Sequence, residues 1–178
     1  MMPLGTTAPA FNLLEPLSGK LKSLAELKGP KGTLVMFICN HCPFVIHIEK
    51  ALADLGQEYE NSDISIIAIS ANDINTHPQD APQKMAAKAT QLNYRFAYLY
   101  DESQNTAKAY QAACTPDLFL FDHDLKCVYR GRFDASTPGN NIPVTGSDVK
   151  EAMQCLIKGQ SINAQQYPSM GCNIKWKP

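Results

Sequence analysis

The stretch from Thr33 to Lys50 constrains this chain most, because its apolar pattern changes period within a few residues. Residues 34–38 form a continuous apolar run, which is typical of a strand buried on both faces of a sheet. From Phe44 onward the apolar residues recur at helical spacing, with charged side chains between them. The pattern therefore predicts a buried strand followed by an amphipathic helix, with Cys-Asn-His-Cys-Pro at the junction, residues 39–43.

The junction places a cysteine at the start of the predicted helix. Pro43 suits the first helical position, where its missing N–H has no partner within the helix, so Cys42 is expected at or next to the N-cap. Free N–H groups and the helix dipole favour an anion there. Cysteines in this environment can have a pKa of roughly 3.5–7.5 instead of about 8.5. Cys42 is therefore a candidate nucleophile, and Cys39 is its candidate disulfide partner.

The sequence Leu-Val-Met-Phe-Ile-Cys-Asn-His-Cys at 34–42 resembles the strand and active-site segment of thioredoxins. Counting five residues on from Phe37, as in thioredoxins, reaches Cys42, so the second cysteine of this CxxC occupies the nucleophile position. A nucleophile followed by proline resembles the peroxiredoxins. With Cys-Thr-Pro-Asp at 114–117 and Gly-Cys-Asn-Ile-Lys-Trp at 171–176, nearly the whole chain is similar to a peroxiredoxin-like branch of the alkyl hydroperoxide reductase/thiol-specific antioxidant family, in the thioredoxin superfamily.

The order of predicted elements agrees with this resemblance. Strands alternate with helices and end in a hairpin and a last helix, which indicates an α/β class with a thioredoxin-like fold. We expect a central mixed β-sheet flanked by helices, with an N-terminal extension and a C-terminal tail. Residues 1–178 are expected to form a single domain, of which 160–178 is the tail. Asp101 is expected to cap a helix, with Gln104 at its N3 position.

The resemblance implies further site residues. It implies a cis bond between Thr115 and Pro116, in a segment that passes beside the nucleophile and contacts the backbone of the substrate. Cys114 then lies near the cysteine pair, either as a functional thiol or as a small buried side chain. His41 either tunes the thiolate and shuttles protons or is a solvent-facing loop residue.

The tail carries Cys172 in a segment with no period of its own. We expect the tail to fold back over the active site, where Cys172 either forms a disulfide with Cys42 or Cys39 or remains a structural thiol. A disulfide needs Cα atoms roughly 4.4–6.8 Å apart, so direct resolution requires close approach.

Two positions separate the expected reaction from its rival. Peroxiredoxins place Thr or Ser three residues before the nucleophile and an Arg later; here these positions hold Cys39 and, at or near the second, Pro116. Disulfide exchange needs neither residue. The expected function is a thiol–disulfide oxidoreductase, and a thiol peroxidase with a peroxidatic Cys42 is the alternative. A non-catalytic metal- or partner-binding module is a third possibility, in which Cys39, His41, Cys42 and Cys172 are the available zinc ligands.

Charge and hydropathy exclude other classes. The 178 residues carry a net charge of -1 with no basic run, so no nucleic-acid partner is expected. No apolar stretch approaches the ~20 residues of a membrane helix, and the N-terminus has no signal-peptide pattern. We expect a cytoplasmic protein without cofactor or metal, whose partners are a disulfide or peroxide substrate, small or protein, and a thiol reductant. The segment 130–134 is expected to be a salt-bridged loop or, alternatively, a substrate contact.

Overall fold

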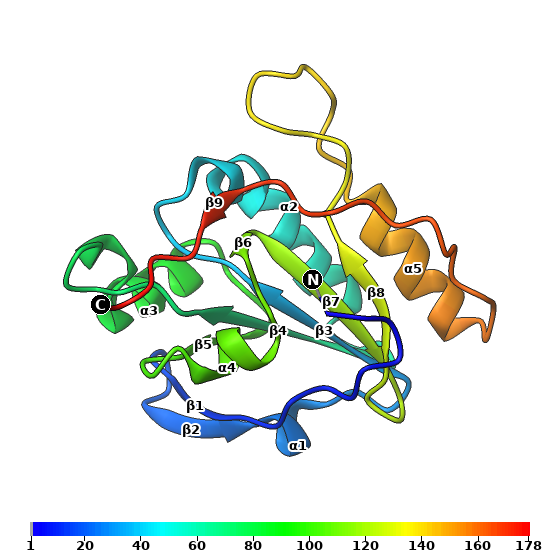
Figure 1. Ribbon diagram of the computed structural model, residues 1–178, viewed down its shortest axis with the longest axis horizontal. Helices are drawn as coiled ribbons and strands as arrows, with labels where there is room; N and C mark the ends of the chain where they lie inside the picture. The colour runs from blue at the N-terminus through cyan, green and yellow to red at the C-terminus, as the bar shows by residue number, and fades with distance from the viewer. Residues whose placement is uncertain (1) are drawn as a thin grey trace.

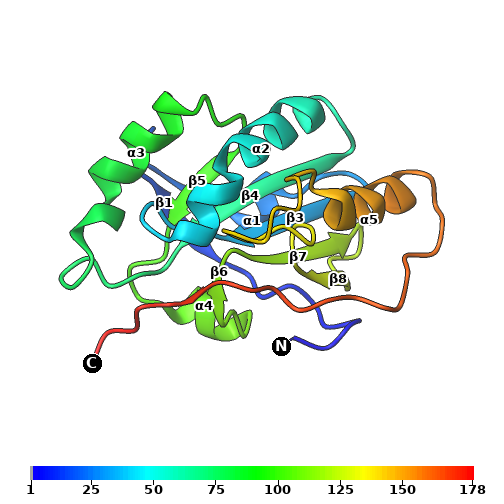
Figure 2. The ribbon, with the colours of Figure 1, turned by 90° about the horizontal axis from the view of Figure 1, so that it is seen from above.

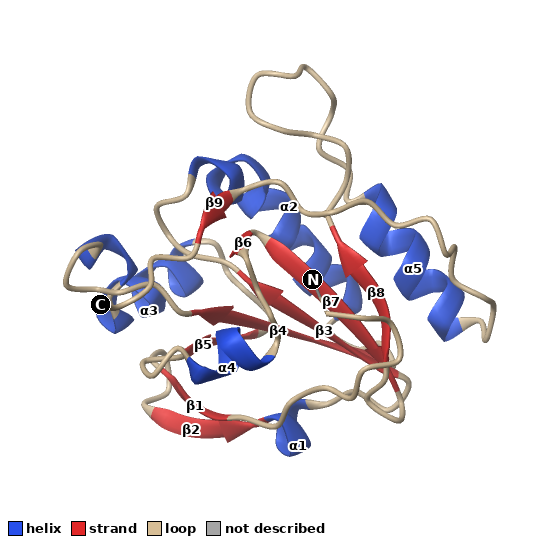
Figure 3. Cartoon of the chain, viewed as in Figure 1, coloured by secondary structure: helices blue, strands red, loops and turns tan. Residues whose placement is uncertain are grey.

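Seven strands form the central sheet of the computed structural model, which describes residues 2–178 (Figures 1 and 3). In order across the sheet they are β2 (Lys20–Ser23), β1 (Asn12–Glu15), β5 (Ala97–Tyr100), β4 (Ile64–Ser70), β3 (Gly32–Phe37), β7 (Asp117–Asp122) and β8 (Cys127–Gly131). Strands β3, β4 and β5 are parallel, whereas β7, β8 and the β1–β2 hairpin pair antiparallel. The mixed α/β architecture predicted from the sequence is therefore present.

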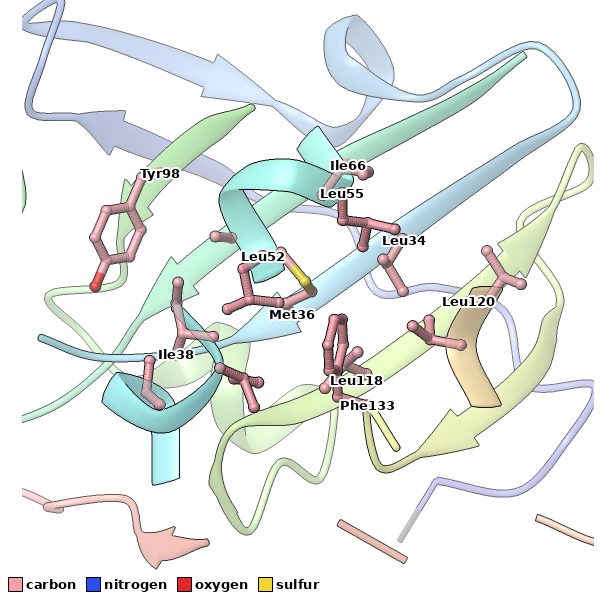
Figure 4. Packing of buried hydrophobic residues seen from close by; sticks show 14 of the residues in the cluster. Leu34, Met36, Ile38, Leu52, Leu55, Ile66, Tyr98, Leu118, Leu120 and Phe133 are labelled. Atoms are coloured by element: carbon pink, nitrogen blue, oxygen red, sulfur yellow. The ribbon is translucent and has the colours of Figure 1, made fainter. Parts of the chain in front are cut away.

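Helices cover both faces of this sheet. They are α1 (Leu24–Leu27), α2 (Pro43–Tyr59), the 3-10 helix η1 (Pro78–Asp80), α3 (Pro82–Gln91), α4 (Asn105–Ala109) and α5 (Ser147–Ile157). Side chains of β3 alternate: Leu34 and Met36 join the core with α2, α3 and α5, while Val35 and Phe37 face α1 and α4. Figure 4 shows Leu34 and Met36 beside the α2 side chains. Burying each such side chain contributes roughly 1.5–3 kcal/mol, which favours an interior position for β3 between β4 and β7.

The strand-to-helix junction lies where the sequence predicts it. Strand β3 is fully buried and ends at Phe37, and α2 begins at Pro43 with Cys42 as its N-cap. The start of α4 differs from the prediction, because the helix begins at Asn105 and Gln104, in a left-handed conformation, is its N-cap residue instead of its N3 residue. The Asp101 carboxylate does accept from the N–H of Ala107 in the first turn, so Asp101 caps a free N–H of the helix as expected.

The C-terminal tail returns across the molecule. After α5 it runs past α2 and the end of β7 to the other side of the sheet (Figures 1 and 2). On the way it forms β9 (Cys172–Asn173), which pairs antiparallel with β6 (Cys114–Thr115). Among the described residues no helix is both long and apolar enough to span a membrane.

Candidate active site

The N-terminus of α2 carries Cys42 with its sulfur pointing into the protein. The residue is 0% exposed, its backbone is extended, and Pro43 follows at the first helical position. Hydrogen bonding by Cys39 lowers the pKa of Cys42 to about 4, and the thiol and backbone N–H of Cys172 and the N–H of Val45 act in the same direction, against burial. Cys42 is therefore the member of this pair that is ionised at neutral pH.

Cys39 has the opposite character. It follows β3 and is 3% exposed. Its thiol donates to the Cys42 sulfur, and this bond, burial and the negative charge of Asp80 together raise its pKa far above that of a free thiol. A proton shared between two sulfurs remains on one of them, so the thiolate on Cys42 requires a protonated Cys39.

Thr115 contacts both cysteines. Its hydroxyl lies 3.4 Å from the Cys39 sulfur, and its carbonyl lies 3.2 Å from the Cys42 sulfur, to which a protonated Cys42 donates. The Thr115–Pro116 bond is cis, as the resemblance implies. Cys114, the other residue of β6, donates to the Pro116 carbonyl at 3.6 Å, and burial raises the pKa of its thiol to about 12. Cys114 is thus protonated at neutral pH.

His41 is part of a buried polar network. Its Nδ1 lies 2.6 Å from Asp80, whose carboxylate is fully buried, and its ring stacks on His77 at 4.8 Å. Asp80 also accepts from the backbone N–H of Asn40 at 2.7 Å and from the side chain of Asn72 at 2.8 Å. The network fixes the turn between the two cysteines. It also places a carboxylate and an imidazole within 4.8 Å of the Cys39 sulfur.

Asp80 was not identified from the sequence. It stands 38 positions after Cys42 in a polar loop, and no spacing rule connects η1 to the cysteine turn. The available signal was chemical. An aspartate in a loop between Pro78 and Pro82 is an ordinary surface residue unless a buried partner needs its charge, and the partner is known only from the fold.

Cys172 lies where the expected tail path takes it. The antiparallel pair joins Thr115 to Cys172, and the Cys172 thiol and N–H reach the Cys42 sulfur. Cys172 is half-buried, and burial together with the neighbouring Cys42 raises its pKa to about 11. The site therefore holds one thiolate flanked by two protonated thiols. All six cysteines of the chain are free thiols in this structure.

The cluster of Cys39, His41 and Asp80 is the set of potential metal ligands found in the described part of the chain. Two of its atoms, His41 Nδ1 and an Asp80 oxygen, are 2.6 Å apart and hydrogen-bonded to each other. Ligands held about 2.0–2.1 Å from a tetrahedral zinc ion are separated by roughly 3.3 Å. The arrangement observed is thus a hydrogen-bonded network, in which the His41 and Asp80 atoms bind each other and not a metal ion.

Residues 130 and 131 end strand β8, and the loop that follows carries the expected salt bridge. Arg132 Nε lies 2.7 Å from Asp148, and its guanidinium stacks on Tyr167 at 4.3 Å. Asp134 accepts from backbone N–H groups of the same loop and of the turn before α5. A cavity of about 170 Å³ nevertheless connects this loop with Pro116.

Comparison with protein families gives the relationship of this chain. The profile of the AhpC/TSA family matches residues 4–130, well over half of the sequence. The chain belongs to the AhpC/TSA family. A comparison with curated proteins gave no match.

Solved structures confirm the fold of this AhpC/TSA protein. An uncharacterized conserved protein from Geobacillus kaustophilus is 49% identical, with a TM-score of 0.98, over 100% of this chain and 94% of that chain. A hypothetical protein from Sinorhizobium meliloti 1021 is 43% identical, with a TM-score of 0.97, over 99% and 96%. A putative thioredoxin from Neisseria meningitidis, at 20% identity and a TM-score of 0.65 over 86% and 91%, shares the fold. Family and fold together support a redox role of the thiol–disulfide oxidoreductase or peroxidase type.

Proposed function

We propose that this protein is a thiol–disulfide oxidoreductase with Cys42 as the nucleophile. The observation that carries the proposal is the opposite pKa displacement of Cys42 and Cys39, two sulfurs that contact the same residue, Thr115. A thiolate attacks a disulfide, and a protonated neighbour keeps that thiolate formed until the attack occurs.

The reaction proceeds in two exchanges. The Cys42 thiolate attacks a disulfide R–S–S–R, forms a mixed disulfide and releases one thiolate RS⁻. Cys39 then loses its proton and attacks the Cys42 sulfur, which forms the Cys39–Cys42 disulfide and releases the second RS⁻. The substrate disulfide is reduced to two thiols while the cysteine pair is oxidised. A dithiol reductant of the cell returns the pair to its reduced form, and we therefore place the protein in the cytoplasm, where such reductants are abundant.

The second exchange needs a base, because Cys39 holds its proton tightly. Asp80 and His41 lie within 4.8 Å of its sulfur, and the His41 side chain is 21% exposed, so it connects the buried carboxylate with solvent. We assign these two residues to accept the Cys39 proton and pass it to water. Cys172, which also reaches the Cys42 sulfur, is the second candidate for resolving the mixed disulfide.

The alternative is a thiol peroxidase, and membership of the AhpC/TSA family is the observation that favours it. Against it stand Cys39 and Pro116 at the positions that activate peroxide in peroxiredoxins. The arginine nearest to Pro116 along the cavity is Arg132, whose guanidinium is held by Asp148 and Tyr167. In the described part of the chain no arginine forms a hydrogen bond with Cys39, Cys42 or Thr115.

Stopped-flow rates of the reduced protein with hydrogen peroxide and with a small disulfide test the proposal. We expect the peroxide rate to resemble that of an ordinary thiolate, and the disulfide rate to exceed that of a free thiol at the same pH. A peroxide rate orders of magnitude above that of a free thiol contradicts the proposal and establishes the peroxidase. The Cys42→Ser variant is the control, because it must be inactive with both oxidants.

A further inference from the structure

The short β6–β9 pair lies directly beside the nucleophile. Its register aligns Thr115 with Cys172, and the Thr115 carbonyl is the group 3.2 Å from the Cys42 sulfur. The tail thus presents a cysteine to Cys42 from an antiparallel strand. A disulfide-bearing peptide that paired with this strand edge would bring its own sulfur to the same place.

Gly171 shows that this pairing is built for close approach. A Cβ atom at this position would lie 2.1 Å from the carbonyl oxygen of Thr115, a distance that no side chain tolerates. The constraint is packing alone, since Gly171 is not among the glycines with positive φ. Only glycine therefore lets the tail backbone lie against the edge of β6.

The tail is anchored on both sides of β9. Before it, the Ser169 hydroxyl donates to the Gly131 carbonyl at 2.6 Å. After it, Ile174 is 1% exposed within the core on the α4 face of the sheet. The next residue, Lys175, donates its N–H to the Asn72 side chain at 2.8 Å. Strand β9 is thus docked between these contacts, and an incoming peptide has to displace it from β6.

A smaller molecule has another place to bind. The cavity of about 170 Å³ lies beside the first turn of α2 and is lined by Phe44 of that turn, by Pro116 and by Met170 of the tail. Met170 is 64% exposed, so its flexible side chain can move without unpairing β9. The volume is below the roughly 300–1,000 Å³ of sites for drug-sized ligands, so the cavity admits only a very small molecule and not a folded chain.

We propose that the docked strand β9 excludes polypeptides from the Cys114–Thr115 edge, so that the substrates of Cys42 are low-molecular-weight disulfides. This inference rests on the proposed function and narrows its substrate class. Its chemistry is the two-step exchange already described, in which a small R–S–S–R yields two thiols and the Cys39–Cys42 disulfide. Gly171 and the tail act as the determinants of this specificity.

The test compares two substrates in single turnovers of the reduced protein, followed by acid quench, alkylation and mass spectrometry. The substrates are bis(2-hydroxyethyl) disulfide and insulin. We expect the wild type to oxidise with the small disulfide and to react slowly with insulin. Gly171→Ala, which prevents the β9 pairing, should raise the insulin rate about tenfold or more, since losing even one or two hydrogen bonds of the tail is worth that factor. The rate with the small disulfide should change far less.

Two further variants keep the result decisive. Ile174→Ala loosens the tail from its other side and must shift the insulin rate in the same direction. Gly159→Ala is the matched control: its backbone φ is +66°, but an added Cβ meets no atom within 4 Å, so the ratio of the two rates should remain that of the wild type. Equal insulin rates for the wild type and Gly171→Ala overturn the inference and leave the proposed function intact. A wild type inert towards both disulfides refutes the proposed function itself.

Discussion

The cysteine turn, residues 39–43, carries Cys42, and the tail, residues 160–178, covers it; the two segments are held by different forces. The turn follows a fully buried strand and is fixed from within by the Asp80 carboxylate. The tail contributes little to the core beyond Ile174 and is attached mainly by backbone hydrogen bonds and short polar contacts. The turn therefore sets the ionisation of the nucleophile rigidly, whereas the tail, whose contacts are weaker and more exposed, sets access to it.

The largest effect is expected from removing the charge of Asp80, whose carboxylate is buried behind the turn. Asp80→Asn should slow the second exchange, release of the second thiol, by roughly 10- to 100-fold, because Cys39 loses its proton acceptor. Removing the negative charge also lowers the pKa of Cys39, and we expect the loss of the acceptor to outweigh this opposite effect. The first exchange should change little, because Cys42 is already ionised. Rapid-quench measurement of the two thiols released from a small disulfide separates the steps.

The control for Asp80 is Asp124→Asn, since Asp124 also pairs with a histidine, His123, but at the exposed surface. That substitution should leave both steps unchanged. Equal slowing of the first and second exchange in Asp80→Asn would show that Asp80 only holds the turn together and does not act on Cys39.

The ionisation of Cys42 gives a prediction of pH dependence. Because the folded-state pKa is lowered to about 4, the thiolate should persist from neutral pH down to that value and disappear below it. Cys39→Ala removes the largest stabilising donor and should move the midpoint upward, towards the ordinary value of about 8.5, so that the thiolate fraction at about pH 6 falls at least tenfold. Ultraviolet thiolate absorbance against pH measures this directly.

Cys127→Ala is the comparison variant for this titration. Cys127 is buried in β8, and burial raises its pKa to about 11, so it contributes no thiolate in this range. The midpoint of the Cys42 titration should remain low in this variant. An unchanged midpoint in Cys39→Ala would mean that the helix and the tail, without Cys39, hold the thiolate.

Access to Cys42 should depend on the tail. Ile174→Ala removes a fully buried anchor, and truncations of this kind cost about 2–5 kcal/mol when the site is intact. We expect alkylation of Cys42 to accelerate by roughly 30-fold or more, because only the tail needs to open and about 2 kcal/mol corresponds to that factor. Ile142→Ala, at a position 44% exposed in the loop before α5, should have no effect. Equal rates in these two variants would show that Cys42 is exposed by some motion other than opening of the tail.

The smallest effect is expected at Gln104, which holds the last residues of the tail. Its side chain donates to the Lys175 carbonyl at 2.9 Å and accepts from the Lys177 N–H at 2.9 Å. Gln104→Ala removes these bonds but leaves Ile174 buried between them and β9, so alkylation of Cys42 should rise by a few-fold at most. An effect larger than that of Ile174→Ala would place the main anchor of the tail at its end.

The same two regions show how far sequence reasoning reaches. The turn was predictable because each signal is local: an apolar strand, a proline at the first helical position and a cysteine before it. The capping box of Ser23 and Glu26 at the start of α1 is another local feature, defined by a spacing of three residues. Such patterns reflect local backbone preferences, so they can be recognised without knowledge of the fold.

Contacts between distant segments were accessible only in part. The position of Cys172 near Cys42 was expected because the tail carries a cysteine in a segment without periodicity and is long enough to reach the site, whereas its pairing with Thr115 was not expected. Gln104 looked like a capping residue three positions after Asp101, but its side chain holds the tail instead. Asp80 was not predicted, since its burial depends on partners such as Asn40 and His41, which lie far away along the chain.

The most direct test of the account is to trap the mixed disulfide. The Cys39→Ser/Cys172→Ser variant, which lacks both resolving candidates, is incubated with bis(2-hydroxyethyl) disulfide and analysed by intact mass and peptide mapping, beside Cys42→Ser. At about pH 8, we predict a single adduct on Cys42 in the first protein and no comparable adduct on Cys39 in the second. Faster modification of Cys39 in the protein without Cys42, or no adduct on Cys42, would contradict the assignment of Cys42 as the nucleophile.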